Sequence, residues 1–126
     1  LKDQKYEDIE DQVRTNLEGM IKVTRASLPY LKEAVVNIAS GAGKTAYEGL
    51  TTYSATKFGV RGFTQALAQE MEQLKVYAVN PGMTATRMTN FRGAPPARVA
   101  AIVVNTVVGK YDIESGGDID VWDYEE

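Results

Sequence analysis

The sequence predicts an α/β fold built around a parallel sheet. Segments with apolar residues three and four positions apart alternate with short, continuously apolar runs, in the order helix, strand, helix, strand, helix, strand. A helix therefore separates each strand from the next, and crossover connections of that length join parallel strands in the right-handed sense. The chain has 126 residues, of which 44% are hydrophobic, and these suffice for a modest core.

The first predicted helix covers about residues 5–30. Its apolar side has the spacing of an amphipathic helix and contains Ile9, Val13, Leu17, Met20, Ile21 and Thr24. Acidic residues cluster at its start, where the helix dipole favours negative charge, and this explains the cluster better than metal binding does. Pro29 cannot continue regular helical hydrogen bonding, so we expect the helix to end near this residue.

The first predicted strand is joined to the second predicted helix by a loop with three glycines, which runs from Gly41 to Leu50. Residues 34–39 are apolar except for Asn37, as expected for a buried strand. The second helix is predicted from Thr51 to about Gln73. Its expected apolar side contains Phe58, Gly62, Phe63, Ala66, Leu67 and Met71.

The last two predicted strands flank the third helix. Residues 76–79 are expected to form a strand, and Asn80-Pro81-Gly82 then forces a turn. Pro95-Pro96 starts the third helix, because proline is tolerated in the first turn of a helix. Gly116-Gly117 introduces the last strand, residues 118–122, and an acidic tail follows. We interpret the acidic residues of this strand and tail as solubilising charge.

Tyr53 and Lys57 are one helical turn apart in the first two turns of the second predicted helix. A phenol has a reference pKa of about 10, so a tyrosine that exchanges protons near neutral pH needs a fixed cation nearby. Residues four apart share a helix face with Cβ atoms roughly 5–6 Å apart, which puts Lys57 in position to be that cation. The same spacing also occurs in ordinary solvated surface pairs, so the pair needs support from other residues.

That support comes from the residues that follow the first two predicted strands, Ser40 and Asn80-Pro81-Gly82. The carboxyl ends of parallel strands meet at one edge of the sheet, where the catalytic groups of open α/β folds collect. We therefore expect both segments to face one crevice, in which the Ser40 hydroxyl can hydrogen-bond a substrate oxygen.

These residues, in this order and spacing, resemble the short-chain dehydrogenase/reductase family. The resemblance covers nearly the whole chain and rests on Asn16-Leu17-Glu18-Gly19, Ser40-Gly41, Tyr53-Ser54-Ala55-Thr56-Lys57, residues 80–86 and Gly116-Gly117-Asp118. It implies an oxidoreductase that interconverts an alcohol and a carbonyl by hydride transfer, with NAD or NADP as cofactor and a small molecule as substrate.

The resemblance also implies a role for each matching residue. Tyr53 corresponds to the general acid/base, Lys57 to the lysine that makes this tyrosine more acidic and holds the nicotinamide ribose, and Ser40 to the serine that orients the substrate. Asn16 corresponds to a helix asparagine that supports a water-linked proton path. Besides Tyr53 and Lys57, the residues implied to contact the cofactor are Pro81, Gly82, Thr84 and Thr86.

One part of the family pattern is missing. Family members begin with a strand and a glycine-rich turn for the cofactor pyrophosphate, and no such segment precedes Asn16. We therefore expect residues 1–126 to be the C-terminal part of a single Rossmann-like domain, with the last three strands of a doubly wound parallel sheet and their flanking helices. The first strand would then expose an unpaired apolar edge, which the missing N-terminal half or another copy of the chain would cover. Because the family dimerises through the first two helices of this part, we also expect a homo-oligomer.

Two other functions stay open at this point. The chain could be a non-catalytic remnant of the fold that serves assembly. Alternatively, the stretch from Gly41 to Thr45 is similar to the end of a phosphate-binding loop, whose amides and lysine hold a nucleotide phosphate. Ile38 replaces the first glycine of that motif, however, and Gly49 follows too soon for the helix that should start at Lys44. A flexible loop beside the substrate is therefore the favoured interpretation.

The expected walls of the substrate pocket suggest a ligand with both apolar and polar parts. Tyr47 and Leu50 would come from the glycine-containing loop. Met88, Phe91 and Arg92 would come from residues 87–94, which are predicted to form a lid over the substrate.

Charge and composition argue against several classes of function. The net charge of −3, with acids and bases interspersed, gives no basic field for nucleic acid. The chain contains no cysteine and no histidine, which excludes disulfides, thiol chemistry, histidine general bases and the usual zinc sites. No apolar stretch reaches the roughly 20 residues that span a bilayer, and no signal peptide is visible, so we expect a cytoplasmic protein.

Overall fold

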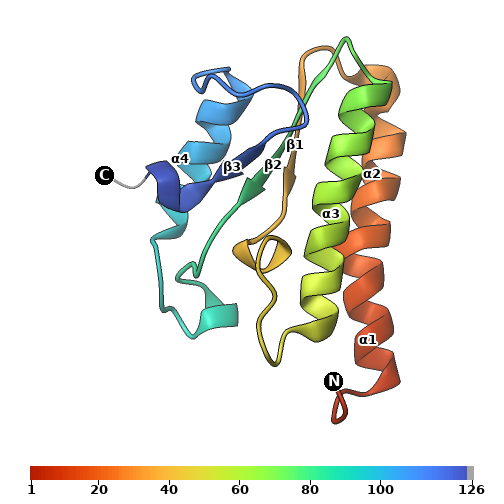
Figure 1. The fold of residues 1–126 in the computed structure, drawn as a ribbon, viewed down its shortest axis with the longest axis vertical. Helices are drawn as coiled ribbons and strands as arrows, with labels where there is room; N and C mark the ends of the chain where they lie inside the picture. Colours follow the sequence, from red (N-terminus) through yellow and green to blue (C-terminus); the bar gives the residue numbers. More distant parts are fainter. Residues whose placement is uncertain (125–126) are drawn as a thin grey trace.

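Three parallel strands form the centre of the chain in the computed structural model, which describes residues 1–124 (Figure 1). The strands are β1 (Ala34–Ile38), β2 (Lys75–Asn80) and β3 (Asp118–Asp120), and they lie in the order β1-β2-β3. Ala78 in the central strand lies opposite Asn37 on one side and Asp118 on the other. The predicted α/β fold with a parallel sheet is confirmed.

The N-terminal helix is continuous but irregular. It consists of α1 (Tyr6–Val13), a π-helical turn (Arg14–Glu18), α2 (Gly19–Ser27) and a final 3-10 turn (Leu28–Tyr30), so the predicted helix over residues 5–30 is confirmed. The backbone keeps right-handed helical dihedral angles at both junctions of the π turn. A π turn inserted into an α-helix is uncommon and is found frequently at functional sites. Asn16 lies within this one.

The remaining helices cover opposite faces of the sheet. α3 (Thr51–Glu70) packs on one face, and the N-terminal helix lies alongside α3 (Figure 1). α4 (Pro96–Val107) covers the other face, where it contacts β1. Alternate strand residues supply the two cores. The residues buried on the α4 face are Val79, Ile102, Ile119 and Val121, and those on the α3 face are Ala39, Val60, Leu67, Leu74, Val76 and Ala78.

Two predicted element ends are wrong. α3 ends at Glu70 and not near Gln73, because Met71 has φ −115° and ψ 69° and so leaves the helical region. The last strand stops at Asp120, and Val121–Tyr124 form a 3-10 turn instead of continuing to Trp122. This turn redirects the chain at the edge of the sheet where the first two strands end.

The predicted apolar side of α3 is also partly wrong. Phe58 is 42% exposed, and Gly62 and Ala66 are exposed as well. The helix instead buries Ser54, Thr56, Val60, Thr64 and Leu67. Threonine can be buried here because its hydroxyl is satisfied locally. Thr64, for example, donates to the Val60 carbonyl at 2.8 Å and accepts from Asn37 Nδ2 at 3.0 Å.

β1 lies at the edge of the sheet, as predicted. Within residues 1–124 it pairs only with β2, and its last residue, Ile38, is 44% exposed. In the same described part of the chain, no helix combines the length and apolarity needed to cross a bilayer.

Candidate functional site

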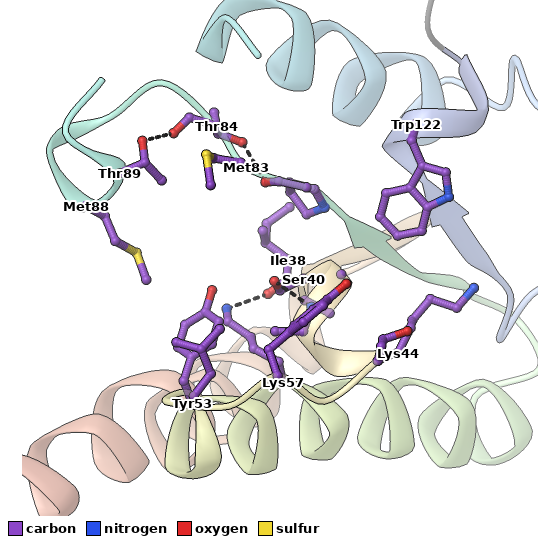
Figure 2. Close-up of a pocket in the computed structure, with 18 of the residues that line it drawn as sticks. Ile38, Ser40, Lys44, Tyr53, Lys57, Met83, Thr84, Met88, Thr89 and Trp122 are labelled. Carbon is purple, nitrogen blue, oxygen red and sulfur yellow. Dashed lines mark hydrogen bonds between the residues drawn. The ribbon is translucent and has the colours of Figure 1, made fainter. Parts of the chain in front are cut away.

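A cavity of about 680 Å³ lies where β1 and β2 end and α3 begins (Figure 2). This volume is within the usual range of small-molecule sites. All the site residues predicted from the sequence, except Asn16, line the cavity: Ser40, Tyr53, Lys57, Pro81, Gly82, Thr84 and Thr86. The expectation that the two strand ends face one crevice is therefore confirmed.

The Ser40 loop is fixed to the neighbouring strand end. Ser40 Oγ accepts a hydrogen bond from the Ala42 amide at 3.1 Å and thereby caps the short 3-10 turn Gly41–Gly43. The Gly41 amide donates to the Pro81 carbonyl at 2.8 Å, which ties the two strand ends together. Because the Ser40 oxygen accepts the Ala42 bond, its own proton is available to donate to a ligand oxygen.

Tyr53 and Lys57 come from the first two turns of α3. Lys57 Nζ donates to the Ile38 carbonyl at 3.1 Å and lies 5.7 Å from the centroid of the Tyr53 ring. This separation is within the range of a cation–π contact. Burial lowers the pKa of Lys57, because the ammonium loses hydration. An ammonium has three donors, so two remain for a ligand after the bond to Ile38.

Asn16 lies near the same pair in a second cavity. It does not line the main cavity but a shallower one of about 510 Å³, which Tyr53 and Lys57 also line. Asn16 Nδ2 donates to Thr56 Oγ1 at 3.3 Å, and Thr56 Oγ1 donates to the Tyr53 carbonyl at 2.7 Å. The π turn of the first helix is thus linked to the start of α3.

The glycine-containing loop does not have the geometry of a phosphate-binding loop. No helix starts at Lys44, since α3 begins only at Thr51. Lys44 Nζ is paired with Asp120 Oδ2, and Gly43 packs against the backbone of Lys57, where an added Cβ would lie 2.7 Å from the carbonyl oxygen. A phosphate cradle needs a helix N-terminus and a free lysine directly after the loop.

A network of charged and amide groups adjoins the cavity through Lys44, which lines the cavity and pairs with Asp120. Arg61 Nε and Nη2 each donate to a different oxygen of Asp118 at 2.9 Å, while Arg61 Nη1 donates to the Gly43 carbonyl at 2.7 Å. Asn80 Nδ2 donates to Asp118 Oδ1 at 2.9 Å and to Asp120 Oδ1 at 2.8 Å. The hydrogen bonds from Arg61 hold the pKa of Asp118 below its usual value, and those to Asp118 raise the pKa of Arg61.

The interpretation of Asp118 and Asp120 as solubilising charge is therefore wrong. Their side chains are only 21% and 14% exposed. Their spacing could have indicated a shared site, because residues two apart on a strand point to the same face of the sheet. Arg61 had no comparable signal, since its partner lies 57 residues away along the chain.

The walls of the cavity are partly as predicted. Tyr47, Leu50 and Met88 line it, whereas Phe91 and Arg92 do not. Asn90 and Phe91 both have positive φ angles, 55° and 59°, and both are exposed to solvent. Sequence reasoning missed Trp122, Met83 and Thr89, which also line the cavity. Trp122 lies far from the other site residues in the sequence, in the 3-10 turn that follows β3.

The sequence is similar to those of known proteins. Residues 1–96 match the family described as short chain dehydrogenase. The 3-oxoacyl-[acyl-carrier-protein] reductase FabG of Pseudomonas aeruginosa is 34% identical over 116 residues, which are 87% of this chain and 45% of that enzyme. The chain thus spans less than half the length of this curated relative.

Solved structures have the same fold. An oxidoreductase from E. coli, yciK, superposes with a TM-score of 0.87 at 25% identity, over 96% of this chain and 55% of that one. A short chain dehydrogenase from Burkholderia cenocepacia, solved in complex with NADP, gives a TM-score of 0.85 at 24% identity, over 95% of this chain and 57% of that one. These likenesses agree with the match over residues 1–96, which establishes that the chain belongs to the short chain dehydrogenase family.

Proposed function

We propose that the chain is the catalytic part of an oxidoreductase that interconverts an alcohol and a carbonyl with NAD or NADP. The observation that carries the proposal is the convergence of Ser40, Tyr53 and Lys57 on one cavity. Membership of the short chain dehydrogenase family supports the reaction class and the cofactor class. When bound, the nicotinamide supplies or accepts the hydride.

The residues present fit such a cofactor. Pro81, Gly82, Thr84 and Thr86 line the cavity beside the end of β2 and offer backbone and hydroxyl groups to a flat amide-bearing ring. The two remaining donors of Lys57 suit the hydroxyl groups of a ribose. Lys57 is held in place for this by its bond to the Ile38 carbonyl, 3.1 Å away.

In the proposed reduction, Ser40 and Tyr53 act on the substrate oxygen. The Ser40 hydroxyl donates to the carbonyl oxygen and fixes its position. Tyr53 then transfers its phenolic proton to that oxygen as negative charge develops there. The ammonium of Lys57, 5.7 Å from the Tyr53 ring, favours the phenolate that remains. In the oxidation the proton moves in the opposite direction.

Asn16 is proposed to assist in returning the proton. The cavity that contains Asn16 also reaches Tyr53 and Lys57, so water there could connect the pair with solvent. Self-association, the cytoplasmic location and the extent of the domain stay predictions.

Replacing Tyr53 by Phe tests the proposal. This variant keeps the ring beside Lys57 and removes only the proton donor, so turnover should fall by about 100-fold or more. Tyr47→Phe is the matched control, because Tyr47 lines the same cavity and is 56% exposed. Its turnover should stay close to that of the wild type. If Tyr53→Phe kept substantial activity with the reduced nicotinamide, the proposed mechanism would be wrong.

A second candidate function is a non-catalytic role in assembly. Its basis is the edge of β1, which has no strand partner within residues 1–124 and which either the rest of the protein or another copy of the chain would cover. Calorimetric titration with NADP and with NAD separates the two candidates. Binding of either cofactor supports the oxidoreductase, and absence of binding by the folded full-length protein favours the assembly role.

A further inference from the structure

Trp122 forms one end of the cavity, and nothing in the family match assigns it a role. It lies in the 3-10 turn after β3, outside residues 1–96. Figure 2 shows its indole across the cavity from Tyr53 and Met88. The side chain is 42% exposed, so much of the ring is open to a ligand.

Two glycines lie next to the indole. A Cβ atom added to Gly41 would lie 3.3 Å from Trp122 Cζ3, which is closer than an ordinary contact, whereas one added to Gly82 would lie at an ordinary contact distance of 4.0 Å from Cε3. These glycines directly follow Ser40 and Pro81 at the two strand ends. The indole therefore lies beside the backbone that follows Ser40 and Pro81.

The rest of the cavity wall is mostly apolar. Exposed large side chains line it, and these are Ile38, Tyr47, Leu50, Met83 and Met88. No carboxylate is among the described lining residues, and the charge of Lys44 is neutralised by Asp120. Away from Lys57, the cavity thus offers no free charge to an ionic group on a substrate.

We propose that Trp122 is a specificity-determining residue, and that it selects uncharged carbonyl compounds that carry a flat apolar ring. This inference rests on the proposed function. The carbonyl group lies at Ser40 and Tyr53, and the ring packs against the open face of the indole. Aromatic rings in such contacts prefer offset or edge-to-face arrangements, which a partly exposed indole permits.

Kinetics with two methyl ketones test the inference in the full-length protein. 2-Acetonaphthone carries a flat double ring, and acetone presents the same reacting group without one. Trp122→Ala should raise KM for 2-acetonaphthone on the order of 3- to 10-fold, the range for an aromatic contact, and leave kcat/KM for acetone unchanged. Trp122→Phe should recover much of the loss. Equal losses for both ketones, or no loss for either, would overturn the proposal.

Fluorescence tests the same contact without turnover. Trp122 is the single tryptophan of the 126 residues, and the Trp122→Phe variant reports any other contribution to the emission. Titration with 2-acetonaphthone should quench the emission of Trp122 saturably, whereas quenching of N-acetyltryptophanamide rises linearly. Tyr53→Phe should still quench saturably, but at higher concentrations of the ketone, because the carbonyl loses a hydrogen bond while the ring keeps its contact with the indole.

The two failures can be told apart. Saturable quenching in a protein that reduces neither ketone would refute the proposed function and leave the aromatic site standing. Quenching that rises linearly, as it does for N-acetyltryptophanamide, in a protein that reduces acetone would refute the role of Trp122 and leave the proposed function standing.

Discussion

Removal of the Arg61 side chain should destabilise the fold by about 2–3 kcal/mol. Arg61 makes two hydrogen bonds of 2.9 Å to Asp118 and one of 2.7 Å to the Gly43 carbonyl. Breaking a buried ion pair costs about 3–5 kcal/mol, and breaking an exposed one costs about 0.2–1 kcal/mol. The two side chains are 18% and 21% exposed, so the expected cost lies between these limits and nearer the buried case.

Arg61→Ala is best compared with Lys22→Ala. Lys22 pairs with Glu18 at 3.4 Å, but these side chains are 73% and 49% exposed. An exposed pair four residues apart on a helix contributes only about 0.3–0.5 kcal/mol. Both substitutions put alanine into a helix, so the change in helix propensity is small in each.

The assay is unfolding in urea, followed by circular dichroism. Arg61→Ala should lower the midpoint with little change in the slope of the free energy against urea, while Lys22→Ala should hardly move the midpoint. If the two variants differed by less than about 0.5 kcal/mol, the Arg61–Asp118 pair would not be the stabilising link inferred here.

Further predictions concern pH and the glycines of the site. Arg61 lowers the pKa of Asp118 in the folded state, so the unfolded chain binds this proton first as the pH falls. The stabilisation from Asp118 is therefore complete above about pH 5 and lost as the pH falls through the lowered folded pKa. In urea unfolding measured from neutral to acidic pH, the free energy of unfolding should fall less steeply for Asp118→Asn than for the wild type. Gly43→Ala should destabilise the fold by at least about 1–3 kcal/mol, because the added Cβ would lie 2.7 Å from the Lys57 carbonyl oxygen. Gly62→Ala should instead stabilise the fold by roughly 0.5–1 kcal/mol, because Gly62 lies within a helix and the added Cβ would have no atom within 4 Å. Equal urea midpoints for Gly43→Ala and Gly62→Ala would contradict these contacts.

The order of the elements and the meeting of Ser40, Tyr53 and Lys57 could be predicted from the sequence. Both follow from local rules. Apolar spacing separates helices from strands, and parallel strands bring their carboxyl ends to one edge. The four-residue spacing of Tyr53 and Lys57 likewise fixes their common helix face.

Features that depend on distant contacts could not be predicted. Arg61 pairs with Asp118, which lies 57 positions away in the sequence. A hydrophobicity pattern alone would predict that both charged side chains lie on the surface. The buried threonines of α3 misled the assignment of its apolar side, because their hydroxyls are satisfied by groups such as the Val60 carbonyl. Trp122 reaches the cavity through the 3-10 turn that ends β3, and no periodic pattern marks that turn.

The most direct test of the central claim is the transfer of deuterium from a reduced nicotinamide labelled at the reactive carbon. The full-length protein would be incubated with the labelled cofactor and a panel of methyl ketones, and the alcohols would be examined by mass spectrometry. We predict alcohol labelled at the former carbonyl carbon with the wild type and with Tyr47→Phe, and almost none with Tyr53→Phe. If the wild type bound the cofactor and formed no labelled alcohol, or if Tyr53→Phe formed as much as the wild type, the account of this cavity as a hydride-transfer site would be contradicted.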